Sequence, residues 1–315
     1  MGCMKADNKD MGVAFFIGND LTSYILAYRT AEDLIKLGIR VLVISVESVN
    51  KKSAKPPLIL SEFLFFERSL LNQHVIPLLD SLAPSEKRPI KSLGVLSHRS
   101  GGRLSHIRVS KVNSSETVDA LRFHRIGVGL SIRCYQKFGA SIISYFTEIA
   151  KGEPAALMNL HPGLLPNYRG VITFFRAMQN RETQAGFTLH YIDLDWDAGP
   201  IIQSWPIPLD YKKSVLANMI AAGQEICSST ASCLVECLEG NHPKCFKQEK
   251  DLAHYYTFPS EEELYAAKLA DINLFKPEDF TNLYCQWFAQ DQDILCNNLI
   301  STLKELPWQM DFMMS

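Results

Sequence analysis

The chain lacks the segments that would mark a membrane or secreted protein. No uninterrupted apolar run reaches the roughly 18 residues that a membrane-spanning helix needs. The first ten residues are polar, without the apolar core of a signal peptide. The start Met1-Gly2-Cys3 is similar to an acylation signal, but Ala6 stands where myristoylation needs Ser or Thr. We therefore expect a cytoplasmic protein with no membrane partner, a dispensable extension over residues 1–10 and a fold that begins at Met11.

An excess of positive charge is also missing. The formal net charge is -2 at pH 7, which gives no general attraction for a polyanion. Residues 241–315 hold six lysines and no arginine against twelve acidic side chains. Such an acidic region is a poor match for the phosphates of tRNA, so we expect no nucleic-acid partner.

Signals for a dinucleotide or a metal are absent as well. Residues Gly18-Asn19-Asp20 offer one glycine where a dinucleotide-binding turn needs three. Asp193, Asp195 and Asp197 alternate like the start of a calcium loop, but Ala198 occupies the glycine position of that loop. The eight cysteines contain no Cys-x-x-Cys pair. We expect no metal and eight reduced cysteines.

What the chain does have is a substantial apolar core and alternating strand and helix patterns. Hydrophobic residues make up 47% of the sequence. The patterns predict an α/β fold, a Rossmann-like, open, twisted and mostly parallel sheet flanked by helices. We expect a catalytic domain over residues 11–210 and a smaller, helical C-terminal region over 211–315 that could form a dimer contact. The stretch 84–103, rich in Pro, Gly and basic residues, predicts a solvated loop. Strands are expected at 13–17, 40–46, 106–112, 126–130, 155–161 and 186–192, and helices at 19–37, 60–82 and 115–123.

Three polar side chains lie at or just after the ends of two of the expected strands. Asn159 and His161 end a short buried strand and, being two residues apart, face the same side. Pro162 and Gly163 then turn the chain out of the sheet. Asp197 follows the next strand in the acidic loop that ends at Gly199. Strand exits are the usual place for a site in an open α/β sheet.

This set of side chains suits transfer of an acyl group to an amine. An Asn amide can donate to a carbonyl oxygen that gains charge during nucleophilic attack. A histidine can accept the proton that the amine sheds, and a carboxylate can orient the imidazole and stabilise its charged form. We therefore predict Asn159 as oxyanion donor, His161 as general base, and Asp197 as the orienting group and proton relay.

At these residues the chain resembles the folate-dependent formyltransferases. Their shared pattern Asn-x-His-(Pro/Ser)-(Ser/Gly)-x-Leu-Pro-x-aromatic-basic-Gly, followed by Asp-x-Gly, occurs here at residues 159–170 and 197–199. The resemblance extends over most of residues 11–210. Through segments 130–133 and 170–177 the chain is most similar to the amino-sugar N-formyltransferases. It implies N10-formyltetrahydrofolate as the formyl donor and a small-molecule amine as the acceptor, first of all a nucleotide-linked amino sugar.

The resemblance also implies where the folate lies. Its pteridine is expected between the segment from Leu130 to Arg133 and the acidic loop. Gly163 departs from the Ser that many relatives have there, which removes a hydroxyl contact. The expected cofactor-binding residues are Leu130, Ile132, Arg133, Gly163, Leu164, Leu165, Pro166, Ile192, Asp193, Asp195 and Gly199.

Basic and aromatic residues provide candidate contacts to the acceptor. Arg99 and Arg103 flank two glycines, and arginine forks with exposed backbone N–H groups suit phosphate oxygens. Tyr168 and Arg169 stand just before Gly170, at the end of the family pattern. These four residues are the predicted acceptor contacts, with a plain solvated loop as the alternative for the first two.

Several other functions share parts of this pattern. A formyltetrahydrofolate deformylase would use water as the acceptor, but carries its extra module before the catalytic half. A methionyl-tRNA formyltransferase has a C-terminal domain that is usually a basic barrel. A hydroxylamine or amino-acid amine in siderophore or antibiotic synthesis is a further acceptor, and an inactive folate-binding relative is the non-enzymatic alternative.

Overall fold

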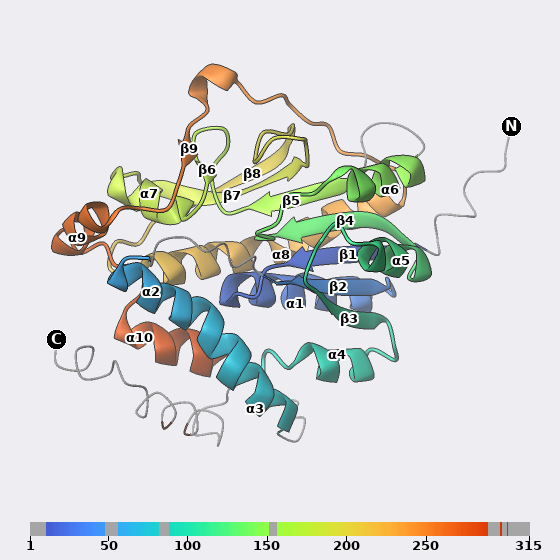
Figure 1. The fold of residues 1–315 in the computed structure, drawn as a ribbon, viewed down its shortest axis with the longest axis horizontal. Coiled ribbons are helices and arrows are strands. Elements are labelled where there is room, and N and C mark those ends of the chain that lie inside the picture. Colours follow the sequence, from blue (N-terminus) through green and yellow to red (C-terminus); the bar gives the residue numbers. More distant parts are fainter. Residues whose placement is uncertain are drawn as a thin grey trace, which may run out of the picture.

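The computed structural model describes residues 11–47, 56–81, 88–150 and 156–288, with the single positions 297 and 301. The expected extension at 1–10 lies outside them. A seven-stranded sheet with the strand order β3-β2-β1-β4-β5-β7-β8 forms the centre (Figure 1). Its strands are β1 (Gly12–Ile17), β2 (Val41–Val46), β3 (Leu104–Val109), β4 (Ile126–Ile132), β5 (Leu157–His161), β7 (Gln184–Tyr191) and β8 (Ile201–Pro208).

The sheet is mostly parallel, as predicted. Strands β1 to β5 run in one direction, whereas β7 pairs antiparallel with β5 and β8 pairs antiparallel with β7. The carboxyl ends of the five parallel strands therefore meet at one edge of the sheet. This carboxyl edge is where ligands bind in open α/β sheets.

Helices cover both faces of the sheet. Val13 and Phe15 of β1 point into a core shared with α1 (Leu21–Lys36) and α8 (Val215–Leu238). Phe16 points to the opposite face, towards α5 (Ser115–Phe123) and α6 (Ala140–Ala150). Because α8 packs on α1, part of the chain beyond residue 210 belongs to the central core.

The helix expected at 60–82 is present with an unexpected centre. It consists of α2 (Leu58–Leu64), the π-helical turns η2 (Phe65–Ser69) and η3 (Leu71–Val75), and α3 (Ile76–Ser81). The wider turns direct Glu67 and Asn72 inwards, over the carboxyl ends of β1 and β4.

The prediction of a solvated loop over residues 84–103 is wrong in part. From residue 88 onwards this stretch contains α4 (Leu93–Arg99), where the composition predicts only a loop. The hydroxyl of Ser92 accepts a hydrogen bond from the Val95 amide at 3.2 Å, so an N-cap begins this helix despite the glycine that follows.

Beyond α8 the chain is only partly helical. Residues 239–260 form a largely irregular connection with the short turn η4 (Lys250–Leu252). Its strand β9 (Tyr255–Tyr256) pairs with β6 (Arg169–Gly170), which follows the loop after β5. The remaining helices are α7 (Thr173–Gln179), α9 (Glu261–Leu269), α10 (Pro277–Asp279), η5 (Phe280–Cys285) and α11 (Gln286–Phe288).

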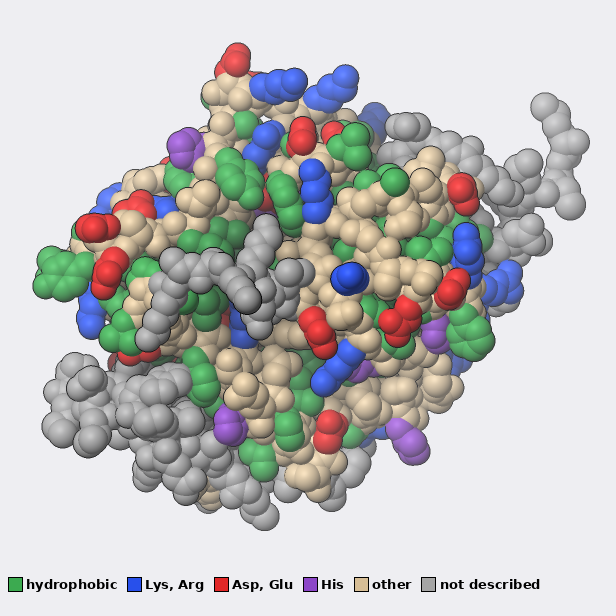
Figure 2. All heavy atoms as spheres, viewed as in Figure 1, with side chains coloured by type: hydrophobic (Ala, Val, Ile, Leu, Met, Phe, Trp, Pro, Cys, Tyr) green, Lys and Arg blue, Asp and Glu red, His purple; other side chains and the backbone are tan. Residues whose placement is uncertain are grey.

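The cysteines require a second correction. Five cysteines in the described ranges are free, but Cys285 is disulfide-bonded, so the expectation of eight reduced cysteines is wrong. That expectation came from the absence of a secretion signal, whereas pairing depends on which sulfurs the fold brings together. Across the described ranges, no helix is long and apolar enough to cross a membrane. Figure 2 shows acidic and basic side chains interspersed over the visible face.

Candidate active site

The strand register brings the predicted polar side chains together. In β5, Met158 and Leu160 point into the core beside α1 and α8, while Leu157 points to the other face. The alternation therefore places Asn159 and His161 on the same side as Leu157, as the sequence predicts. Both lie at the carboxyl edge of the sheet.

His161 is buried between a carboxylate and a backbone carbonyl. Its Nδ1 lies 3.4 Å from Oδ1 of Asp197, and its Nε2 lies 2.7 Å from the carbonyl oxygen of Tyr168. Because a carbonyl oxygen only accepts, Nε2 carries a hydrogen and donates it. In the neutral ring Nδ1 is then the basic nitrogen, and a proton gained there lies against the Asp197 carboxylate.

Asn159 is oriented by a histidine that the sequence does not single out. The Nδ2 atom of Asn159 lies 3.1 Å from Nε2 of His190, whose Nδ1 lies 2.8 Å from the Tyr191 carbonyl oxygen. His190 can donate to that carbonyl and accept from Asn159 only in its neutral form. Burial lowers the pKa of His190 to about 4, which agrees with this assignment.

The second N–H direction of Asn159 is less committed. Asn159 Nδ2 lies 3.5 Å from Oδ1 of Asp197, a long contact for a hydrogen bond. This donor can turn to another acceptor, such as a carbonyl oxygen, at small cost. His190 lies opposite Asn159 in the β5–β7 register, so only the strand pairing reveals it.

The loop after β5 is held by its own backbone and by Thr188 of β7. The Thr188 hydroxyl donates to the Gly163 carbonyl at 2.7 Å and accepts from the Leu165 amide at 3.1 Å. A Cβ at Gly163 would lie 2.4 Å from the Tyr168 carbonyl oxygen and 2.7 Å from His161 Nε2. Glycine therefore allows the contact between His161 and Tyr168. The Leu165–Pro166 peptide of this loop is cis.

Asp197 lies in a tight turn after β7. Its backbone has φ of 53°, in the left-handed region, and its Oδ2 accepts the Gly170 amide at 2.9 Å. A Cβ at Gly199 would lie 1.8 Å from the Tyr191 carbonyl oxygen, so this position needs glycine. Ile192 is partly buried, whereas Asp193 and Asp195 are exposed on the outer side of the turn.

The other predicted cofactor residues lie around this group in different ways. Leu164 is partly buried and Leu165 is buried beside the core, and Pro166 follows them in the loop. The side chains of Leu130 and Ile132 are fully buried in the sheet. A pteridine beside β4 would meet the backbone at the end of this strand rather than those two side chains.

Arg133 points away from the three candidate catalytic residues. It has φ of 54°, and its guanidinium contacts Asp20 at 3.1 Å and Glu67 at 2.7 Å. The Tyr135 hydroxyl accepts from the same guanidinium at 2.7 Å. Burial raises the pKa of Glu67 to about 7, with the positive charge of Arg133 opposing this shift. This cluster joins the carboxyl ends of β4 and β1 to the helix above them.

The four residues predicted to contact the acceptor do not lie together. The Tyr168 hydroxyl donates to Glu182 at 2.7 Å, and Arg169 donates to the side-chain oxygen of Gln248. Arg99 and Arg103 lie at the turn before β3, which is the amino end of that strand. From Arg103 to the carboxyl end of β3 is about 20 Å along the strand.

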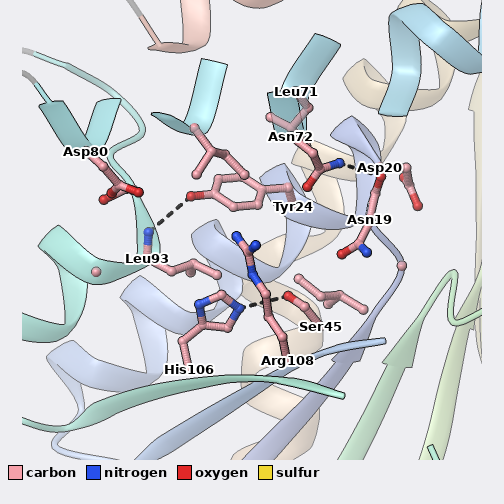
Figure 3. Close-up of a pocket in the computed structure, with 15 residues that line it drawn as sticks. Asn19, Asp20, Tyr24, Ser45, Leu71, Asn72, Asp80, Leu93, His106 and Arg108 are labelled. Atoms are coloured by element: carbon pink, nitrogen blue, oxygen red, sulfur yellow. Dashed lines mark hydrogen bonds between the residues drawn. The ribbon is translucent and has the colours of Figure 1, made fainter. Parts of the chain in front are cut away.

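A cavity opens at the carboxyl ends of β1, β2 and β3. Its volume is about 150 Å³. Arg108 and His106 come from β3 and lie below the Tyr24 ring in Figure 3. His106 Nε2 lies 2.8 Å from the Ser45 hydroxyl, and burial, aided by Arg108, lowers the pKa of His106 to about 4. The polar and charged lining residues are Asn19, Asp20, Tyr24, Ser45, Asn72, Asp80, Ser92, His106 and Arg108.

The fold and this polar edge define an α/β protein with its candidate site at the carboxyl ends of the strands. Residues 141–225 match the family model described as formyl transferase. This stretch contains Asn159, His161 and Asp197. The match confirms, over these residues, the resemblance to formyl transferases that the sequence indicates.

Curated relatives match a little over a third of the chain. A methionyl-tRNA formyltransferase from Pseudothermotoga lettingae is 31% identical over 120 residues, which cover 37% of this chain and 38% of the relative. A phosphoribosylglycinamide formyltransferase from Haemophilus influenzae is 25% identical over 109 residues, covering 35% of this chain and 50% of the relative. The chain thus spans half or less of the length of these two relatives.

Solved structures of formyltransferases resemble the chain at low sequence identity. An N-formyltransferase from Helicobacter canadensis, solved with folinic acid and dTDP-3-aminofucose, is 18% identical with a TM-score of 0.48, over 80% of this chain and 72% of that chain. A phosphoribosylglycinamide formyltransferase from Anaplasma phagocytophilum is 15% identical with a TM-score of 0.47, over 79% of this chain and 100% of that chain.

Proposed function

We propose that the protein transfers a formyl group from N10-formyltetrahydrofolate to the amine of a small molecule. One observation carries this proposal: the two contacts of His161, 3.4 Å to the Asp197 carboxylate and 2.7 Å to the Tyr168 carbonyl, leave Nδ1 as the basic nitrogen beside a carboxylate. Asn159 lies two residues away on the same strand face. These residues fit a formyl donor because one N–H of Asn159 has only a 3.5 Å contact.

The chemistry divides among these side chains. The folate supplies an activated formyl carbon and a nitrogen leaving group. Asn159 donates to the formyl oxygen as the amine nitrogen bonds to the formyl carbon. His161 accepts the amine proton at Nδ1, and Asp197 stabilises the resulting imidazolium. The same proton then passes to the departing folate nitrogen, which leaves a formamide and tetrahydrofolate.

For the acceptor we propose a nucleotide-linked amino sugar. The cavity at β1 to β3 supports this choice because it lies on the same carboxyl edge as His161 and is lined by hydroxyls, amides and both charge signs. Its volume of about 150 Å³ suits a sugar-sized group with several polar atoms. Arg108 supplies a cation for an anionic part of such a molecule.

The test is a formyl-transfer assay with a panel of acceptors. The panel contains nucleotide-linked amino sugars, free amino acids, hydroxylamines and methionyl-tRNA, with water as the deformylase control. We expect formylation of a nucleotide-linked amino sugar. Formylation of methionyl-tRNA, or formate release without any acceptor, would replace the proposed acceptor by the respective alternative.

A binding measurement separates an inactive relative from an enzyme with another acceptor. A ligand present at 100 times its dissociation constant stabilises the folded state by about 2.7 kcal/mol. We expect a formyl-folate analogue to raise the melting temperature, and a nucleotide-sugar to raise it further. A shift with folate but no transfer to any amine or water would identify a folate-binding protein without activity.

A further inference from the structure

A segment far from the motif in sequence lies directly on the candidate active site. We call residues 246–256 the strap. Phe246 at its start pairs with Ile201 of β8 through two backbone hydrogen bonds of 2.8 Å. At its end, β9 pairs with β6. Figure 1 shows this part of the chain arching from the end of α8 to β9, beside β6, β7 and β8.

Gln248 is the side chain by which the strap reaches the turn of Asp197. Its Nε2 donates to the carbonyl oxygens of Asp197 and Gly199, each at 2.8 Å. Its Oε1 accepts from Arg169, at 3.0 Å from Nε and 2.6 Å from Nη2. Since the guanidinium can only donate and the carbonyls can only accept, the amide has one possible orientation.

The turn that Gln248 holds has a conformation that needs support. Asp197 is a non-glycine residue at φ of 53°, and the left-handed region costs such a residue roughly 1 kcal/mol. Yet its carboxylate must stay 3.4 Å from His161 Nδ1 and 2.9 Å from the Gly170 amide. The two hydrogen bonds from Gln248 to the carbonyl oxygens of Asp197 and Gly199 restrain this turn.

The strap also holds the strand on the other side of the carboxylate. The Arg169 amide donates to the His254 carbonyl at 2.9 Å, and Gly170 pairs with Tyr256 in β9. Tyr256 stacks on Tyr168, whose carbonyl accepts from His161. Both groups that flank His161, the Asp197 carboxylate and the Tyr168 carbonyl, are therefore linked to the strap.

We propose that Gln248 is a positioning residue for the formyl transfer, because it fixes the Asp197 carboxylate against His161. The inference rests on the proposed function and assigns Gln248 no contact with donor or acceptor. It acts through the two carbonyls of the turn, whereas Arg169 fixes the orientation of the Gln248 amide.

The variant Gln248→Glu tests this most directly. Glutamate keeps the shape and can still accept from Arg169, but it places an oxygen against the carbonyls of Asp197 and Gly199. We expect kcat to fall by about 10- to 100-fold, the range found when hydrogen bonds that orient the ligands of a metal site are removed. The KM values for folate and acceptor should stay within about twofold.

The matched control is Glu249→Ala, which removes the neighbouring exposed side chain of the strap. It should keep the wild-type kcat. If Gln248 only stabilised the fold, Gln248→Glu would lower the melting temperature while the folded enzyme kept its kcat, and the proposal would be wrong. Wild-type kcat together with wild-type stability would also overturn it.

Hydrogen exchange gives a readout that does not depend on activity. The Gly170 amide donates to the Asp197 carboxylate, so its exchange reports whether that carboxylate stays in place. We expect peptides containing Gly170 to exchange at least tenfold faster in Gln248→Glu than in Glu249→Ala. If the wild type forms no formamide, the proposed function fails, while unchanged exchange in Gln248→Glu would overturn the positioning role by itself.

Discussion

The two ends of the carboxyl edge of the sheet are built differently. At β5 and β7, Asn159, His161 and Asp197 are each held by a neighbouring side chain or backbone group. At β1 to β3, polar side chains surround a cavity of about 150 Å³. The first end is preorganised, which suits chemistry, and the second leaves room, which suits recognition. A formyl transfer to a polar acceptor needs both.

The largest expected effect comes from a substitution at β5 and β7 that leaves the cavity at β1 to β3 unchanged. We expect His161→Ala to lower kcat by about 10²- to 10⁴-fold, because the proposed general base is lost. The KM of the acceptor should change little if the cavity holds that molecule. Steady-state kinetics measure both quantities, and His124→Ala, at the opposite edge after α5, is the control. A rise in KM with unchanged kcat would mean that His161 binds rather than reacts.

The next effect concerns the ion-pair cluster between the two ends. Arg133→Met removes the cation that contacts Asp20 at 3.1 Å and Glu67 at 2.7 Å, and both carboxylates stay buried. Removing one partner of a buried ion pair typically costs about 3–5 kcal/mol, which urea denaturation measures. Lys36→Ala breaks the exposed pair with Asp33 and should cost less than about 1 kcal/mol. Equal losses in the two variants would contradict a buried structural role for Arg133.

A smaller effect should appear at the recognition end. We expect Arg108→Ala to raise the acceptor KM about tenfold, with kcat and folate KM unchanged, because only the proposed cation for the acceptor is lost. The sequence predicts instead that Arg99 and Arg103 contact a phosphate of the acceptor. Measuring Arg103→Ala beside Arg108→Ala compares the amino and carboxyl ends of β3. A larger KM increase in Arg103→Ala would move the acceptor away from the cavity.

The sequence could predict that Asn159, His161 and Asp197 lie close together, because the signals for it are local. Asn159 and His161 are two residues apart on one strand, and period-two alternation places them on one face. Asp197 follows from the next strand exit and from the family pattern. Thr188 and His190 were not predicted, since their role depends on the pairing of β7 with β5, and the sequence does not state this register.

The cavity and the strap depend on longer-range contacts. Gln248 is 51 residues from Asp197, with α8 between them. The cavity lining comes from three strands and parts of the helices around them. The α4 helix was mistaken for a loop because glycine and basic residues outweighed the Ser92 cap. The π-helical turns that bring Glu67 inwards have no signature in a 3.6-residue pattern.

The smallest effect tests a property that the two ends share. His190 and His106 each have a pKa lowered to about 4 by burial. In the unfolded chain a histidine titrates near 6.5, so the unfolded state binds more protons between pH 6.5 and 4. Stability from the neutral form is present above about pH 6.5 and is lost as the pH falls towards 4.

The variant His106→Gln isolates the contribution of the cavity end. Glutamine can keep a hydrogen bond with the Ser45 hydroxyl but does not titrate. We expect the variant to lose about 1 kcal/mol less stability than the wild type when the pH falls from 7 to 5.5. Urea denaturation at both pH values gives the difference. Equal losses of stability in the two proteins would show that folding does not lower the pKa of His106. The cavity would then be more open to water than the packed surroundings of His190.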